Sequence, residues 1–485
     1  MGGPWALLGF VMSVLDKSRP MLIYISQRWA EVDKVAEKKS ENCRINKLET
    51  TDDTLTSRGG LTFFVKYVGS VGVLGLLLEK FTGIKKSAKG VNVGNLFLQA
   101  LYFFFDGTSR HLSYFDELKK DAGNAAVIEM PDKQVASSHA MKRFFGAFGI
   151  FRADGFRWVL KHLFIWRLKL KKPPVVMMTL DTMVMDNDEA AKRQGCDPTY
   201  KKVKGFQPLH LIWEGKIVDA IFRRGKRHSN YGNDVGKMIR GIVRLIRARY
   251  SASVDIVIRM DAGFFDEKNF ELCDELGIHF IGTGKAFEAI KEKVAAIGEK
   301  EWRIYDNGRQ KWSYTGFEYQ CDKWQNAYRA LYTRPKYDAQ QGLLEFARPD
   351  NIIVTNLASG PQGLGDEELI FHHHQRGADE LPHRGLKEFG SEQLPFKRYG
   401  ANQAYYYLMV IAFFLFQTFK EDNLQDILPV ASYANTVRRQ LVDIAAKVVW
   451  TGGDIILKVT NAVMERLKLD VLWTRCRQAH PVPTS

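Results

Sequence analysis

Two aspartates that directly follow apolar runs are the first residues in the sequence to indicate chemistry. Asp181 follows the run 175–180, and Asp261 comes after the run 253–259 and Met260. Such runs are typical of strands buried on both faces of a sheet, and polar residues at neighbouring strand ends can reach one ion. Two carboxylates offer the hard oxygen ligands that Mg²⁺ or Mn²⁺ prefers. Either aspartate could instead be a turn residue or a helix cap, so the metal hypothesis requires a third acid.

The elements that must position these carboxylates follow from the pattern around them. Residues 206–213 and 216–222, separated by Glu214-Gly215, predict a hairpin, and helices are expected over 233–250 and 267–276. A further strand is expected over 279–284. Strand, hairpin, helix, strand, helix and strand predict an α/β fold with a sheet of mixed direction, in which chemistry belongs at the strand ends.

The remaining chain divides by changes of pattern. We expect a helical N-terminal region over 1–170, with a buried helix near residues 4–15, and a first part of the α/β core over 171–298. Aromatic and β-branched residues alternate with polar ones in 299–360, which predicts a β-rich insertion. The core resumes over 361–425, and 426–485 is expected to be a helical C-terminal region with a possible role in dimerisation.

The third acid comes with a family resemblance. Arg376, Glu380 and Lys387 are spaced as R-x3-E-x6-K, which resembles the Y-x2-R-x3-E-x6-K signature of bacterial insertion-sequence transposases of the DDE type, with His373 in place of the tyrosine. Residues 258–264 resemble the R-x-D-[AS]-[AG]-F motif of that family around Asp261, and 179–184 resemble its first catalytic strand around Asp181. The group most similar is IS thirteen-eighty, with the IS four group as relatives.

Three further segments extend the resemblance over roughly residues 40 to 425. Residues 205–209 resemble the family's G-Y-x-P-L, 224–229 resemble its R-x-G-N-x-H-S turn and 137–144 resemble its S-x-x-T-L-x-R-F helix start. The position of the first motif favours Asp181 over Asp186 and Asp188 as the first catalytic residue. Pro382 indicates that Lys387 lies in a new helix with Pro382 in its first turn, or that the helix is interrupted.

The resemblance implies a ribonuclease H-like catalytic core interrupted by the β-rich insertion. It further implies that Asp181, Asp261 and Glu380 are the catalytic residues and bind two Mg²⁺ ions, for which Mn²⁺ may substitute. The implied enzyme is a DDE transposase that cleaves and transfers DNA strands in cut-and-paste transposition. Its implied partners are double-stranded DNA, as terminal inverted repeats and target DNA, and a second copy in a homodimer on DNA.

Charge and aromatic patterning suggest where DNA is bound. Seventy Lys and Arg against 55 Asp and Glu leave a formal net charge of +15, which suits a polyanionic partner. Basic residues alternate with aromatic ones over 151–172, which suits phosphates and stacking or, equally, a solvated amphipathic helix. The tryptophans of the insertion could stack on a flipped base, although packing within a small β subdomain is favoured. The candidate DNA-binding residues are Arg376, Lys387, His373, Arg259, His228, Arg157, Lys161, Arg167, Lys169, Trp302, Trp312 and Trp324.

Other classes are disfavoured by composition. Five scattered cysteines without a CxxC pair argue against a disulfide framework and a zinc ribbon, so we expect a cytoplasmic, nucleoid-associated protein. The apolar runs 61–78 and 404–419 are interpreted as core helices, and no membrane partner is expected. Two alternatives to an active transposase remain open: a catalytically inactive, domesticated DNA-binding protein and a structure-selective nuclease on the same core.

Overall fold

The computed structural model describes residues 45, 47–284, 288–321, 324–336, 350–360, 363–375 and 381–483. Met1–Asp53 and Thr54–Ser485 form separate units, and the elements below belong to the second. The expected helix near residues 4–15 and the candidate residues Arg376 and Glu380 lie outside the described residues.

Helices dominate the chain before the first long strand, as the sequence predicts. Two of them end at a glycine in the left-handed backbone conformation: Gly72 at φ 74° ends α2, and Gly107 at φ 62° ends α4. Asn92 and Ser137 cap the helices that follow them by accepting backbone N–H bonds. The helices are α2 (Leu61–Val71), α3 (Val73–Phe81), α4 (Val93–Asp106), α5 (Tyr114–Leu118), α6 (Ala122–Val127), α7 (Ser138–Gly146) and α8 (Ala153–Lys171).

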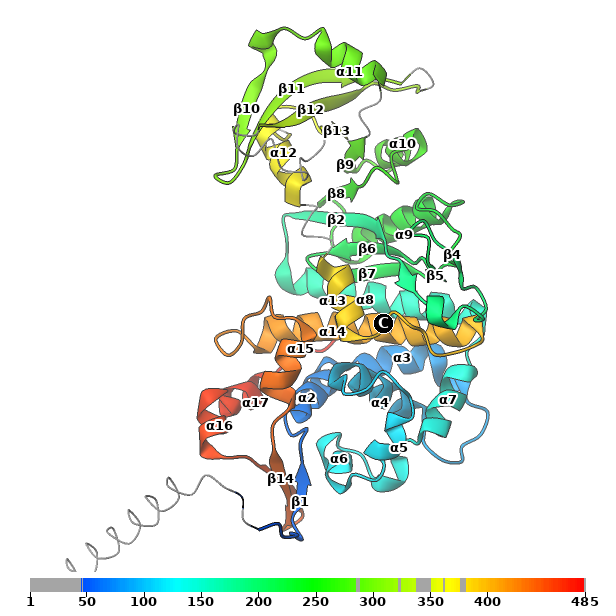
Figure 1. Cartoon of the computed structure of the whole chain (residues 1–485), viewed down its shortest axis with the longest axis vertical. Coiled ribbons are helices and arrows are strands. Elements are labelled where there is room, and N and C mark those ends of the chain that lie inside the picture. Colours follow the sequence, from blue (N-terminus) through cyan, green and yellow to red (C-terminus); the bar gives the residue numbers. More distant parts are fainter. Residues whose placement is uncertain are drawn as a thin grey trace, which may run out of the picture. The chain divides into compact units, whose positions relative to one another are not determined.

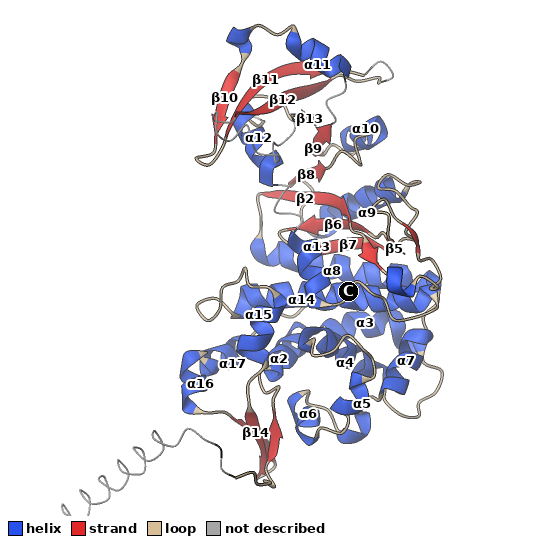
Figure 2. Cartoon of the chain, viewed as in Figure 1, coloured by secondary structure: helices blue, strands red, loops and turns tan. Residues whose placement is uncertain are grey.

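The α/β core contains the predicted elements in the predicted order. Strand β2 (Val175–Thr182) pairs antiparallel with β6 (Leu209–Trp213), which forms a hairpin with β7 (Lys216–Ile221). On its other side β2 pairs in parallel with β8 (Asp255–Met260), and β8 pairs in parallel with β9 (His279–Gly284). The connecting helices are α9 (Asp234–Arg249) and α10 (Glu267–Glu275). The expected mixed α/β class with a large mixed sheet is therefore confirmed (Figure 2).

The β-rich segment continues this sheet. Among the described residues the strands form one nine-stranded sheet in the order β10-β11-β12-β13-β9-β8-β2-β6-β7, because β13 pairs antiparallel with β9 (Figure 1). The added elements are β10 (Arg303–Asp306), β11 (Lys311–Tyr319), β12 (Tyr328–Lys336), β13 (Asn351–Thr355), α11 (Glu288–Ala295) and α12 (Asp366–His374). A small second sheet beside the core has the order β3-β5-β4, from Met185–Asp186, Lys204–Phe206 and Asp197–Pro198.

One long helix, α14 (Tyr399–Asn423), connects the sheet with the N-terminal helices. It packs on α4, α8 and β7, and its side chains from Tyr405 to Phe416 are at most 2% exposed (Figure 1). Its apolar character is therefore that of a core helix. Among the described residues, no single helix is long and apolar enough to cross a membrane, while α2 with the adjoining residues 73–84 passes that test only as a pair bent by 65°.

The expectation of an entirely helical C-terminal region is wrong. Between α15 (Ala434–Val437) and α16 (Asn461–Arg466) the chain forms the hairpin β14 (Ala446–Thr451) and β15 (Asp454–Lys458), and β14 also pairs with β1 (Thr54–Thr56). Gly452 and Gly453, at φ 58° and 87°, allow the tight turn, and β-branched residues in both strands favour extended backbone. The described chain continues to α17 (Leu469–Arg477).

Candidate active site

The two candidate aspartates are brought together by the register of the sheet. Leu180 of β2 and Met260 of β8 are direct partners in a parallel pair. The next residues, Asp181 and Asp261, therefore lie side by side at the carboxyl ends of these two neighbouring strands. Side chains alternate between faces, so both carboxylates share the face that carries Thr179 and Arg259, whose side chains are hydrogen-bonded at 3.0 Å.

Local hydrogen bonds orient both carboxylates. Asp181 Oδ1 accepts a bond from the backbone N–H of Thr182 at 2.6 Å, and Asp261 Oδ1 accepts one from the N–H of Gly263 at 2.8 Å. A Cβ at position 263 would lie 2.9 Å from Ser229 Oγ and 3.0 Å from Asp261 Oδ1. Glycine therefore lets the turn after β8 approach its neighbours closely.

Ser229 joins the turn 224–229 to both strand ends. Its hydroxyl lies 3.3 Å from Thr182 Oγ1, next to Asp181 in the chain, and close to the backbone of Gly263. The fully buried Arg223 holds this turn by donating to the carbonyl oxygens of Gln207, at 3.0 Å, and Ser229, at 3.2 Å. His228, a candidate DNA contact, is exposed and directly precedes Ser229 in this turn.

A chain of aromatic polar groups ends at Asp181. His383 Nδ1 lies 3.6 Å from Asp181 Oδ2, and His383 Nε2 lies 2.9 Å from Nδ1 of His210. The other ring nitrogen of His210 is hydrogen-bonded to the hydroxyl of Tyr406. Burial, together with the positive charges of Lys387 and Lys201, lowers the pKa of His383 to about 4, and burial also holds the pKa of His210 well below its ordinary value. Both rings are therefore neutral at neutral pH.

Two helices that flank the segment 376–380 lie against the same face of the sheet. On one side, His373 of α12 is buried and hydrogen-bonded to Thr283 of β9 at 2.9 Å, and the carbonyl of His372 accepts a bond from Arg259 at 3.3 Å. On the other side, α13 (Leu381–Phe389) carries the His383 ring that contacts Asp181. Both helices that flank Glu380 in the sequence thus contact β2, β8 or β9 near their carboxyl ends.

Pro382 and Lys387 both lie on α13. Pro382 is the second described residue of this helix, and a proline is tolerated in the first turn of a helix, where its missing N–H costs no intrahelical hydrogen bond. Lys387 consequently lies on α13 one turn after His383, and its ammonium group forms an ion pair with Glu392 at 2.7 Å. Lys387 is half-buried and lies on the same side of the helix as His383, the residue that contacts Asp181.

Two of the candidate DNA contacts are internal ion pairs. Arg157 donates two bonds, at 2.8 and 2.7 Å, to Asp219, which is fully buried. Arg167, 4% exposed, donates to Asp422 at 2.8 Å and Glu421 at 3.0 Å. Because these guanidinium groups are occupied inside the protein, we withdraw both residues as DNA contacts. Lys169 of the same helix is exposed and Lys161 is half-buried, so these two stay candidates.

The tryptophans of the β-rich segment contact other protein aromatics. Trp312 is 4% exposed and lies against Tyr305 and His374. Trp324 packs against a cluster that includes Phe270, and Trp302 lies under the guanidinium of Arg334 at 5.4 Å. Packing, the favoured alternative for these residues, accounts for Trp312 and Trp324. Trp302 is half-buried and keeps part of its ring surface exposed.

The donor set fits a divalent cation of the hard type only in part. Asp181 and Asp261 supply carboxylate oxygens at adjacent strand ends, which suits Mg²⁺ or Mn²⁺. No group of three or more His, Cys, Asp or Glu side chains that could hold a metal occurs among the described residues. Glu380, the expected third ligand, is not one of them.

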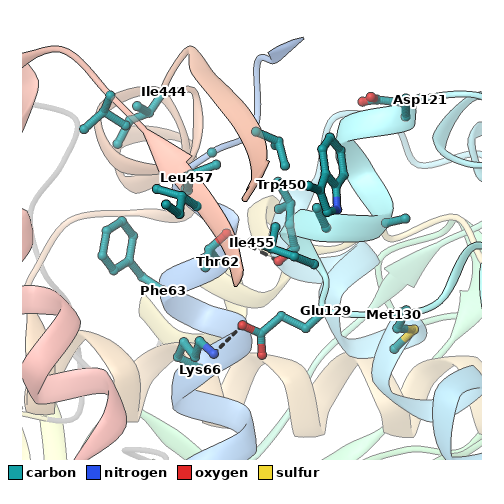
Figure 3. A pocket seen from close by; sticks show the side chains of 18 of the residues that line it. Thr62, Phe63, Lys66, Asp121, Glu129, Met130, Ile444, Trp450, Ile455 and Leu457 are labelled. Atoms are coloured by element: carbon teal, nitrogen blue, oxygen red, sulfur yellow. Dashed lines mark hydrogen bonds and ion pairs between the residues drawn. The ribbon is translucent and has the colours of Figure 1, made fainter. Parts of the chain in front are cut away.

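A large cavity lies away from the two aspartates. A cavity of about 1380 Å³ is lined by α2, by the segment from α6 to Met130 and by the hairpin β14–β15, and it contains neither aspartate (Figure 3). Its wall includes Phe63, Trp450 and Leu457, with an ion pair between Lys66 and Glu129 (Figure 3). The candidate active site is therefore defined by strand ends and not by this cavity.

Sequence reasoning did not single out His210, His383 or Ser229. The last two stand inside quoted motifs, and the spacing of His383, three residues after Glu380 and four before Lys387, could have placed it on the Lys387 face of a helix. His210 had no such signal, because its role depends on a pairing between β2 and β6 and on a tyrosine from α14.

Comparisons with known proteins were made for the whole chain. A family model described as "Transposase DDE domain group 1" matches residues 38–481. Among solved structures, the piggyBac transposase synaptic complex with hairpin DNA is similar with a TM-score of 0.41 and 11% sequence identity, over 81% of this chain and 82% of that chain. No curated protein matches.

Proposed function

The chain belongs to the transposase family described as DDE domain group 1, and from that premise we propose that it cleaves and joins DNA in cut-and-paste transposition. In this proposal it binds the terminal inverted repeats of its element and transfers the cleaved ends into target DNA. The observation that carries the proposal is the register of β2 and β8, which sets Asp181 and Asp261 side by side.

The sheet order supports a ribonuclease H-like core. From β7 through β6, β2, β8 to β9 the sheet has a three-stranded antiparallel meander followed by two strands parallel to the first. In such a core the first and fourth strands are neighbours although a hairpin and a helix separate them in sequence. This arrangement makes the ends of β2 and β8 the natural place for a pair of carboxylates.

Asp181 and Asp261, with Glu380 as a third ligand, would hold two Mg²⁺ ions, for which Mn²⁺ may substitute. Bound metal would polarise the phosphodiester and favour loss of a proton from the attacking oxygen, first of water and then of a DNA 3′-hydroxyl. The protein's own contribution is positional: Thr182 N–H, Gly263 N–H and His383 orient the carboxylates before DNA arrives.

Basic side chains around the aspartates would position the DNA backbone. The turn 224–229 presents exposed Arg224, Lys226 and His228, and Arg376 and Lys387 flank Glu380 in the sequence. Arginine can hold a phosphate through two parallel bonds, so we assign Arg376 to the phosphate next to the cleaved bond. Lys161 and Lys169 would contact phosphates farther away, and a homodimer would bring two active sites to two ends.

The test is cleavage of a labelled DNA fragment that contains one end of the element with its flanking sequence. The full-length protein is incubated with Mg²⁺, with Mn²⁺, with Ca²⁺ or with a chelator. Cleavage at the element boundary in Mg²⁺ and Mn²⁺, absent with chelator, supports the proposal. Binding without cleavage would identify a domesticated DNA-binding protein, and cleavage directed by DNA structure, independent of the end sequence, would identify a nuclease.

A further inference from the structure

Three residues that no motif of the sequence assigns to the reaction form a continuous chain to the first aspartate. They come from three elements: His383 from α13, His210 from β6 and Tyr406 from α14. His210 and Tyr406 are fully inaccessible to solvent, and the His383 side chain is 12% exposed. The chain is therefore a buried connection that ends at Asp181.

With one N–H on each ring, this chain has a single direction. A neutral imidazole has one N–H donor and one acceptor nitrogen, and a carboxylate only accepts. If His383 Nδ1–H points to Asp181 Oδ2, His383 Nε2 must accept from His210 Nδ1–H at 2.9 Å. His210 Nε2 must then accept from the Tyr406 hydroxyl. The order of donation is Tyr406 to His210 to His383 to Asp181.

The position of His210 makes the arrangement rigid. Asp181 and His210 are direct cross-strand partners in the pairing of β2 with β6, so their side chains leave the sheet on one face. The His383 ring contacts both of them. The Thr182 N–H donates to Oδ1 of Asp181, and His383 Nδ1 lies 3.6 Å from Oδ2 of the same carboxylate.

We propose that Tyr406, His210 and His383 are positioning residues that orient the Asp181 carboxylate for metal binding and tie α13 to β2. This inference rests on the proposed function. A donor with no net charge suits this purpose, because it orients the carboxylate without cancelling the negative charge that a cation requires. The same contact ties β2 to α13, the helix that directly follows Glu380 in sequence.

Tyr406, the member of this hydrogen-bonded series farthest from Asp181, offers the most specific variant. Tyr406→Phe removes one oxygen atom and leaves His210 Nε2 without its donor. If His210 then turns to the other tautomer, its Nδ1 becomes an acceptor, and His383 must donate from Nε2 and present a lone pair to Asp181. Tyr407→Phe is the matched control: Tyr407 is the next residue and is 1% exposed, and its hydroxyl is hydrogen-bonded, among the described residues, to the backbone of Ala220 and Phe222.

His383, the member of this series nearest Asp181, can be replaced by either of two amide side chains. In His383→Asn the amide nitrogen lies where Nδ1 stood and can still donate to Asp181, whereas in His383→Gln the amide lies where Nε2 stood and faces His210. A merely structural role would make the two amides similar. Positioning of the carboxylate predicts that the asparagine variant retains more function than the glutamine variant.

The experiment measures Mn²⁺ affinity of the full-length protein by electron paramagnetic resonance, together with the Mg²⁺ concentration that gives half-maximal cleavage. We expect Tyr406→Phe and His383→Gln to weaken Mn²⁺ binding by about tenfold, because replacing residues that orient metal ligands typically costs at least that much affinity. Tyr407→Phe should leave Mn²⁺ binding unchanged. Thermal unfolding of each variant checks folding, and Tyr406→Phe carries the test if the His383 variants do not fold.

The outcomes separate the inference from the function on which it rests. Wild-type affinity in both Tyr406→Phe and His383→Gln, with a wild-type protein that binds Mn²⁺ and cleaves, overturns the inference and leaves the proposed function intact. A wild-type protein that neither binds Mn²⁺ nor cleaves overturns both. An equal loss in Tyr407→Phe also overturns the inference, because it assigns the effect to general packing of α14.

Discussion

Leu180 and Met260 are direct partners across the parallel pairing of β2 with β8, so Asp181 and Asp261 leave the sheet side by side. The two carboxylates come from strands separated by a hairpin and by α9, and only the pairing brings them together. The backbone hydrogen bonds between β2 and β8 fix their proximity. A site built on such strands keeps its geometry better than one built on loops.

Asp181→Asn and Asp261→Asn should each abolish metal-dependent cleavage. The amide retains size and most hydrogen bonding but removes the charge that holds the cation, so we expect a loss of about 100-fold or more. Binding to the element's ends should persist or increase slightly, because the phosphates meet one less negative charge. Cleavage of a labelled end, beside a gel shift of the same DNA, measures both.

Matched controls for these variants stand a few residues further along. Asp186 and Asp188 are exposed and lie past the end of β2. Asp186 accepts a hydrogen bond from the backbone N–H of Asp188, and Asp188 accepts one from the backbone N–H of Lys204. Asp186→Asn and Asp188→Asn should retain most activity. Near wild-type cleavage by Asp261→Asn would refute the proposed site.

Glu380→Gln should have the same effect as the aspartate variants. The third ligand completes the metal site, and α12 and α13 on either side of it contact the face that carries Asp181 and Asp261. Asp379→Asn is the neighbouring control and should cleave normally. If Asp379→Asn is inactive and Glu380→Gln is active, the third acid is Asp379.

Arg376→Ala should reduce cleavage more than binding. A bidentate contact to the phosphate at the cleaved bond orients that bond, while total affinity depends on many other cations. Single-turnover cleavage with protein in excess separates the two quantities. Equal losses in cleavage rate and in affinity would make Arg376 a general phosphate contact.

DNA binding should weaken steeply with salt. A chain with a net charge of +15 that neutralises even about three phosphates gives a log-log slope of about −2.7. We expect a slope steeper than about −2 in binding isotherms from low to moderate salt. A shallower slope would contradict a mainly phosphate-based interface.

Arg157→Ala should destabilise the fold and leave the affinity of the folded protein for DNA unchanged. The substitution leaves Asp219 buried without its partner, which costs about 3–5 kcal/mol for pairs of this kind. Denaturant unfolding measures the free energy of unfolding. Lys169→Ala is the opposite control: this exposed lysine should change stability by less than about 0.5 kcal/mol and should weaken DNA binding.

The sequence alone was sufficient for the parts of the fold that depend on local pattern. The apolar runs before Asp181 and Asp261 predicted strands β2 and β8, since a strand buried on both faces reads as a short continuous apolar run. The motif resemblance predicted Asp181, Asp261 and Glu380 as a catalytic set and indicated a DDE transposase, and the family match agrees with the second prediction at the level of the DDE domain.

Tertiary structure decided what depends on pairing and burial. A basic residue on a helix looks the same in sequence whether it faces water or a buried acid, so the ion pairs of Arg157 and Arg167 appeared only in the fold. Strand β14 of the hairpin pairs with β1, almost 400 residues earlier in the chain, and a pairing over this distance appeared only in the fold. The Tyr406–His210–His383 chain likewise joins residues from three elements, and no spacing rule specifies contacts between side chains that meet only when the sheet and α14 pack.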